Sequence, residues 1–161
     1  MIKKIILWIL VIFISVQIFS FSSDNSNESS GKSGKIVDYV VEIIKDLSIF
    51  EEVNETGLRE QCQFIIRKGA HFSIYMLLAL AVFELSKSYN LKVRHCILIS
   101  ALYCLFYAIS DEIHQLFVDG RSGEVRDVFV DFSGASFGLA FRMFIYKFVK
   151  LSRNKRKKEK F

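Results

Sequence analysis

Apolar residues collect in four blocks along the chain, and polar segments separate the blocks. Each block approaches the ~18–20 consecutive apolar residues with which a helix crosses a bilayer. The pattern predicts an all-α fold, an integral membrane bundle of four transmembrane helices in a single domain over residues 1–161. The helices are expected at about residues 5–21, 64–85, 96–118 and 127–149.

The first block follows a short basic head, Lys3 and Lys4, and has two interpretations. Ser20 and Ser22 flank a large residue in the small-x-small pattern of a signal-peptide cleavage site. The apolar run of residues 5–21, however, is longer than the ~7–15 residues of a signal peptide's apolar region. We therefore expect a retained first helix.

The long segment of residues 22–63 is expected to be an extracytoplasmic loop with one helix in it. Residues 22–34 are rich in Ser, Asn and Gly, which predicts a mobile stretch. Residues 36–50 carry apolar side chains at helical spacing with acids and lysines between them. We expect an amphipathic helix there, on the membrane surface or over the bundle. Residues 54–63 are expected to be a polar connector.

Charge predicts how the chain is oriented. The formal net charge is +5, and basic residues gather at Lys3 and Lys4, at residues 87–94 and in the tail of residues 150–161. Each cluster adjoins an apolar block, so the positive-inside rule predicts that both termini, and the tail, are cytoplasmic. The same adjacency favours membrane lipids as partners over nucleic acid, which is not expected to bind.

This topology brings the polar ends of three helices to one outer surface. Ionisable groups near a hydrocarbon core are costly, so they indicate a functional site by default. Helical spacing puts Asp111, His114 and Gln115 on one face and turns Glu112 about 100° away. The predicted ligand-binding residues are Arg67, Lys68, His71, Asp111, Glu112, His114, Gln115, Arg121, Asp127 and Asp131.

Two chemistries fit these residues, besides a purely structural ion-pair network with Arg67 and Arg121 as partners of the acids. His71, Asp111 and His114 have the ligand types of a divalent metal site. No contiguous metal motif such as HExxH is present, so neither a metal nor another cofactor is predicted.

The alternative is an anion site with acid–base groups. The basic side chains could hold a phosphate or carboxylate, with Asp111, Glu112 and His114 as the catalytic candidates. In the fourth block, Gly134 and Gly138 form a small-xxx-small pair that favours close helix packing.

Two segments, RKGAHFSIYMLLAL and SDEIHQLFVDGRSGEVRDVFVDFSGASFG, resemble the VanZ-like family of small bacterial membrane proteins. The resemblance covers nearly the whole chain and implies a multi-pass plasma-membrane protein. Asp119 stands where the family commonly has Pro, and Asp131 where it often has Asn. The positions that match the family pattern are Lys68, His71, Asp111, Glu112, Gln115, Gly120, Arg121, Asp127, Gly134 and Gly138.

The family takes its name from a protein associated with low-level teicoplanin resistance. Our leading hypothesis is non-enzymatic: the outer polar site binds an envelope component, such as a cell-wall precursor, or a lipoglycopeptide antibiotic. The rival hypothesis is an intramembrane enzyme acting on a phosphorylated or acylated envelope lipid. A third is an accessory subunit whose charges join the helices, and a homo-oligomer remains open.

Overall fold

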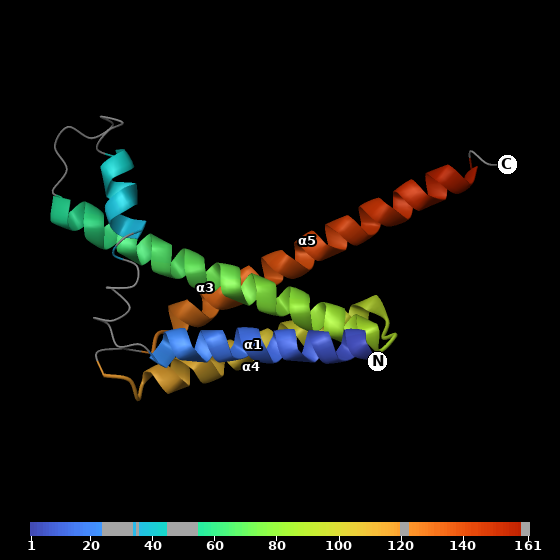
Figure 1. Cartoon of the computed structure of the whole chain (residues 1–161), viewed down its shortest axis with the longest axis horizontal. Coiled ribbons are helices and arrows are strands. Elements are labelled where there is room, and N and C mark those ends of the chain that lie inside the picture. Colours follow the sequence, from blue (N-terminus) through green and yellow to red (C-terminus); the bar gives the residue numbers. More distant parts are fainter. Residues whose placement is uncertain (24–33, 35, 45–54, 120–122, 159–161) are drawn as a thin grey trace.

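The computed structural model describes residues 1–23, 34, 36–44, 55–119 and 123–158, and this part of the chain contains helices and no strand. A short helix covers residues 36–44. The all-α prediction is confirmed. The four long helices are α1 (Ile2–Ser23), α3 (Glu55–Ser88), α4 (Val93–Gln115) and α5 (Val125–Lys158) (Figure 1).

Each long helix contains a span that is long and apolar enough to cross a membrane. The predicted four-helix membrane bundle is therefore confirmed, and the chain is a multi-pass membrane protein. The spans are Ile2–Ser23, Thr56–Ser88, Val93–Gln115 and Val125–Val149.

In the bundle, α1 and α4 run in the same direction, and α3 runs against them (Figure 1). The start of α1 lies beside the turn between α3 and α4, where the Trp8 indole donates a 3.1 Å hydrogen bond to the Tyr89 hydroxyl. The Lys4 ammonium sits 4.2 Å from the centroid of the same ring. Two of the three basic clusters therefore meet at one end of the bundle. We call the opposite end, where α4 ends and α5 begins, the site end.

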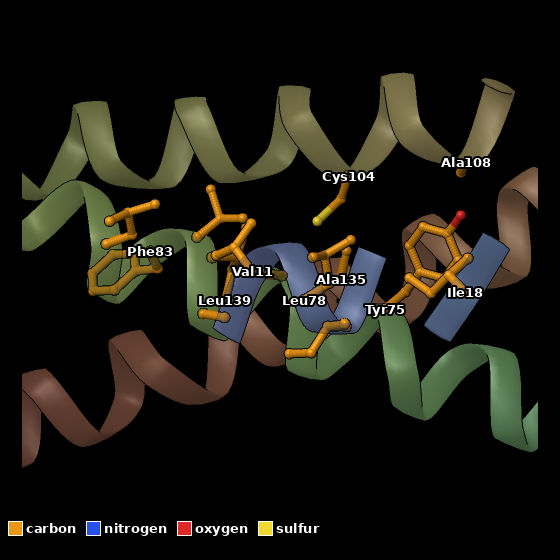
Figure 2. Close-up of a cluster of buried hydrophobic side chains, with 14 of the residues drawn as sticks. Val11, Ile18, Tyr75, Leu78, Phe83, Cys104, Ala108, Ala135 and Leu139 are labelled. Carbon is orange, nitrogen blue, oxygen red and sulfur yellow. The ribbon is translucent and has the colours of Figure 1, made fainter. Parts of the chain in front are cut away.

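The core contains apolar side chains from all four long helices (Figure 2). Large apolar side chains also cover the outside: Phe106 is 65% exposed and Phe144 is 68% exposed. This is the distribution that a lipid environment favours, because hydrocarbon solvates such side chains as well as a protein core does. The labelled core residues are Val11, Ile18, Tyr75, Leu78, Phe83, Cys104, Ala108, Ala135 and Leu139.

Two glycines allow α3 and α5 to touch where they cross. A Cβ built on Gly134 would overlap the backbone of Phe72, and one on Gly138 would lie 2.9 Å from the carbonyl oxygen of Met76. Any larger residue would force the two helices apart. The two glycines therefore allow the close helix packing that their spacing predicts.

The structure corrects the predicted helix ends. α3 begins at Glu55 rather than near residue 64, so the expected connector over residues 54–63 is wrong where it is described. α5 continues to Lys158, so most of the expected 150–161 tail is helix. α1 and α4 also begin and end two to three residues away from the predicted positions. Neither extension contains a proline, the residue that most often ends a helix.

The early start of α3 gives the short helix a partner. Val37 and Val41 of the short helix are buried against Cys62 of α3. The predicted amphipathic helix therefore packs on the extension of α3; its remaining predicted residues, 45–50, lie outside the described part. At about 1.5 Å per residue, the 34 residues of α3 span about 50 Å, well beyond a hydrocarbon core of about 30 Å.

Candidate functional site

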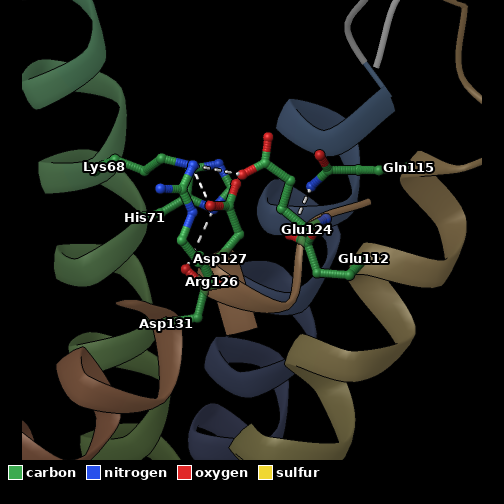
Figure 3. A network of polar contacts seen from close by, with 8 residues as sticks. All are labelled: Lys68, His71, Glu112, Gln115, Glu124, Arg126, Asp127 and Asp131. Carbon is green, nitrogen blue, oxygen red and sulfur yellow. Dashed lines mark hydrogen bonds and ion pairs between the residues drawn. The ribbon is translucent and has the colours of Figure 1, made fainter. Parts of the chain in front are cut away.

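Charged and polar side chains of α3, α4 and α5 gather inside the site end of the bundle (Figure 3). We call this group the polar cluster. The sequence separations Lys68 to His71 and Asp127 to Asp131 are about one helical turn, so the cluster has an outer and an inner layer. Its members are Lys68, His71, Asp111, Glu112, Gln115, Asp127 and Asp131.

The outer layer is an ion pair between α3 and α5. The Lys68 ammonium contacts the Asp127 carboxylate, with side-chain exposures of 15% and 10%. Asp127 stands in the first turn of α5, where the helix dipole also stabilises an anion. Each charge thus has a partner, which offsets part of its desolvation cost.

The inner layer joins three helices. His71 Nδ1 lies 3.4 Å from Asp131 Oδ1, which is longer than the about 2.7–3.2 Å of a good hydrogen bond. Asp111 completes the group, because donor atoms of all three residues lie within 4.8 Å of one another. The Asp131 side chain is 1% exposed, yet neither of its oxygens has a hydrogen-bond partner.

Further buried oxygens around the inner layer are also unsatisfied. Asp111 Oδ2, the Tyr75 hydroxyl and the Ser22 hydroxyl have no hydrogen-bond partner among the described residues. Tyr75 lies near Asp111 and Asp131, and Ser22 lies beside Asp111. Buried polar atoms are rarely left without partners, so this concentration at one point indicates a ligand site.

Glu112 ties the connector before α5 to α4. One carboxylate oxygen accepts a 2.8 Å hydrogen bond from the backbone N–H of Glu124, and the other accepts one of 3.2 Å from Gln115 Nε2. The connector passes close to α4 at Gly123, where a Cβ would lie 2.6 Å from the Glu112 carbonyl oxygen. The start of α5 is thereby held beside the end of α4.

Several predicted site residues lie elsewhere. His114 stacks on Phe19 with ring centroids 4.4 Å apart, and its Nε2 lies 3.1 Å from Ser23 Oγ. The prediction that His114 joins Asp111 is wrong, because a separation of three residues still turns a side chain about 60° around the helix. Among the described residues, Arg67 makes no ion pair with the acids, and Arg121 lies outside the described part.

The sequence did not predict two residues that lie next to the inner layer, Tyr75 and Ser22. Tyr75 lies one turn after His71 on α3, a spacing that could have placed it in the site. Ser22 stands in a polar run at the end of α1, and nothing in that run distinguishes it from its neighbours.

An apolar groove of about 390 Å³ lies between α4 and the beginning of α5. Its polar members, Glu112 and Glu124, come from the site end of the bundle. The groove therefore connects a lipid-accessible apolar surface with one edge of the polar cluster. Its apolar side chains are Leu105, Ile109, Ile113, Leu116, Val125, Val128, Phe129 and Phe132.

A family profile described as VanZ/LLP1 matches residues 6–149. The chain belongs to the VanZ/LLP1 family. The match runs through all four membrane spans and the whole polar cluster, so the family resemblance drawn from the sequence is confirmed. No curated protein and no solved structure matches the chain.

The site of this VanZ/LLP1 protein combines two environments. The polar cluster offers carboxylates, an imidazole and an ammonium group, and the groove offers a dry surface of aliphatic and aromatic side chains. A molecule with a polar head and an apolar chain could use both at once, because the groove includes Glu112 from the cluster.

Proposed function

We propose that this VanZ/LLP1 protein is a plasma-membrane protein with both termini cytoplasmic, and that its outer-face site binds an acylated or isoprenoid-anchored envelope ligand. The apolar chain lies in the groove between α4 and α5. The head group lies at the polar cluster. The observation that carries the proposal is the groove itself, whose walls are apolar and whose site end carries Glu112.

Resistance to an acylated glycopeptide would follow from this binding. A site that holds the acyl chain of teicoplanin, or the lipid-linked wall precursor beside which teicoplanin anchors, would lower the antibiotic's effect at its target. Vancomycin lacks the acyl chain and would be affected less. Discrimination between the two drugs is therefore the signature of the proposed binding mode.

Susceptibility tests can separate the groove from the rest of the helix surface. A deletion strain receives wild type, Ile113→Trp or Ile99→Trp at matched membrane levels. Ile113 lines the groove and is 53% exposed, whereas Ile99 is on the same helix, is 41% exposed and lies outside the groove. The added indole should fill the groove in the first variant and meet only lipid in the second.

We expect wild type and Ile99→Trp to protect against teicoplanin and Ile113→Trp to lose that protection, with vancomycin susceptibility nearly constant. Native mass spectrometry of the purified protein with teicoplanin checks binding directly. Equal protection by both tryptophan variants would remove the groove from the proposal. No protection by wild type would remove the drug as the relevant ligand.

The inner layer supports a second candidate, an enzyme acting on a phosphorylated or acylated envelope lipid. His71 and Asp131, 3.4 Å apart, form a base–carboxylate pair inside the bundle, with Lys68 one turn outward. His71 would then replace His114 as the catalytic candidate beside Asp111. Thin-layer analysis of envelope lipids from strains with wild type or His71→Gln tests this. A lipid product that disappears only in the variant supports the enzyme.

A further inference from the structure

The inner layer has more carboxyl groups than basic groups to pair with them. Asp111 and Asp131 are 4% and 0% exposed. The nearest basic groups are His71 and Lys68, and the Lys68 ammonium is already paired with Asp127. Two bases of α5 are paired with other acids: Arg126 contacts Glu124 at 3.2 Å, and Arg142 contacts Glu84 at 2.6 Å. Two buried carboxylates therefore share one imidazole.

Such an arrangement is costly unless a cation joins it. Moving an isolated carboxylate out of water costs several kcal/mol even after the protein relaxes, and a second one nearby adds repulsion. The unsatisfied oxygens belong to this layer: both oxygens of Asp131, Oδ2 of Asp111 and the hydroxyls of Tyr75 and Ser22. These buried atoms are not all acidic, so they are an observation separate from the charge.

The donor atoms are also spaced for a single ion. His71 comes from α3, Asp111 from α4 and Asp131 from α5, with donor atoms within 4.8 Å of one another. Around a tetrahedral ion with bonds of about 2.0–2.2 Å, ligand atoms lie about 3.4 Å apart. Side-chain movements of about an ångström would bring the three donor atoms to these distances. Tyr75 and Ser22 then supply oxygens for the remaining positions or for a bound water.

The ligand types narrow the choice of ion. Mg²⁺ and Ca²⁺ prefer oxygen ligands alone, whereas imidazole with two carboxylates suits Zn²⁺, Mn²⁺ or a similar transition metal. A divalent charge also matches the two carboxylates with a neutral imidazole. Three protein ligands with room for a fourth is the arrangement of metal sites that keep one position open.

We propose that His71, Asp111 and Asp131 bind one divalent transition-metal ion, of the Zn²⁺ or Mn²⁺ type, inside the site end of the bundle. The ion links α3, α4 and α5 at one level. This inference stands apart from the proposed groove, since the ion is held inside the bundle and the groove opens between α4 and α5 toward lipid. It replaces the sequence-based expectation that the chain binds no metal.

The test uses the full chain purified in detergent without a histidine tag. The protein is stripped with a chelator, dialysed against ZnCl₂, MnCl₂ or MgCl₂, and analysed by inductively coupled plasma mass spectrometry. Wild type should retain about one Zn²⁺ or Mn²⁺ per chain and little Mg²⁺. At about 100 times the dissociation constant, the bound ion should raise Tm by about 5–10 °C.

Matched variants locate the ion. His71→Gln and Asp131→Asn should lose both the bound metal and the metal-dependent rise in Tm. His114→Gln should keep both, because His114 contacts Phe19 and Ser23 rather than the inner layer. Ile113→Trp, which fills the groove, should also keep the metal, so a failed groove hypothesis and a failed metal hypothesis give different results.

Wild-type protein that retains no transition metal and shows no shift in Tm would overturn the proposal without reference to any variant. Equal metal content in wild type, His71→Gln and Asp131→Asn would overturn the assigned ligands. Co²⁺ substitution gives a separate check, because a visible absorption band that disappears in His71→Gln reports imidazole bound to the metal.

Discussion

The crossing of α3 and α5 gives the sharpest stability prediction, from three Gly→Ala substitutions. All three glycines are helical, so alanine brings each a similar gain in helix propensity of up to about 1 kcal/mol. The new methyl group meets nothing within 4 Å at Gly69. At Gly138 it meets the Met76 side chain and carbonyl oxygen, each at 2.9 Å. At Gly134 it overlaps the Phe72 backbone, which cannot rotate away.

Overpacking a well-packed contact costs about 1–3 kcal/mol, and the upper end applies where backbone meets backbone. After the propensity gain, Gly134→Ala should destabilise the protein by about 2 kcal/mol, a fall in Tm of about 4–8 °C. Gly138→Ala should destabilise the protein by less, about 1 kcal/mol, because the Met76 side chain can move away from the new methyl group but the Met76 carbonyl oxygen belongs to the backbone. Gly69→Ala should stabilise the protein slightly.

A thiol-reactive dye can follow thermal unfolding in detergent once Cys62, which is buried against the short helix, is replaced by Ala. Cys96 and Cys104 are free, are buried in the bundle core and react only as the bundle opens. The expected order of Tm is Gly69→Ala highest, then Gly138→Ala, then Gly134→Ala. If Gly134→Ala melts with Gly69→Ala, the helices do not touch at Phe72, and the crossing described above is incorrect.

Three further outcomes are expected. Lys68→Met leaves the Asp127 carboxylate, 10% exposed, without its ion-pair partner, so it should lower the free energy of unfolding by about 2 kcal/mol. Adding Asp127→Asn should restore most of that loss, as measured in a denaturant or thermal melt. Glu112→Ala removes the acceptor of the Glu124 N–H, so hydrogen exchange at that amide should accelerate by roughly tenfold, while Glu112→Gln should stay near wild type; equal rates in both would dismiss the anchoring role. A cysteine at the exposed Lys92 position, with the native cysteines replaced, should resist a membrane-impermeant reagent applied to intact cells and react after permeabilisation; reaction in intact cells would reverse the orientation.

The sequence predicted the helices well because a transmembrane span depends on a long apolar run, which local composition reveals. It predicted their ends poorly. Residues 55–63 are polar and contain Gly57, so they looked like a connector, but α3 continues through them and buries Cys62 against the short helix. A tertiary contact between distant segments stabilises that extension, and local patterns do not contain it.

The candidate site shows the same division. Helical spacing and the family pattern pointed to Lys68, His71, Asp111 and Asp127, and the structure brings them together at one end of the bundle. The predicted ion-pair partners were wrong. A histidine and a lysine of α3 contact the acids of α5, where arginines had been expected. Which partner meets an acid depends on helix rotation and depth, and periodicity within one helix fixes neither.

The ion pairs between α3 and α5 also bear on how the protein enters the membrane during synthesis. α3 leaves the ribosome before α5 and already carries Lys68, His71 and Glu84. The membrane-level charges of α5 that follow, Asp127, Asp131 and Arg142, each find one of these as a partner. A helix bearing such charges is expensive to insert alone. The last span can therefore be accepted into the bilayer against a helix that is already there, and its insertion is coupled to the assembly of the bundle.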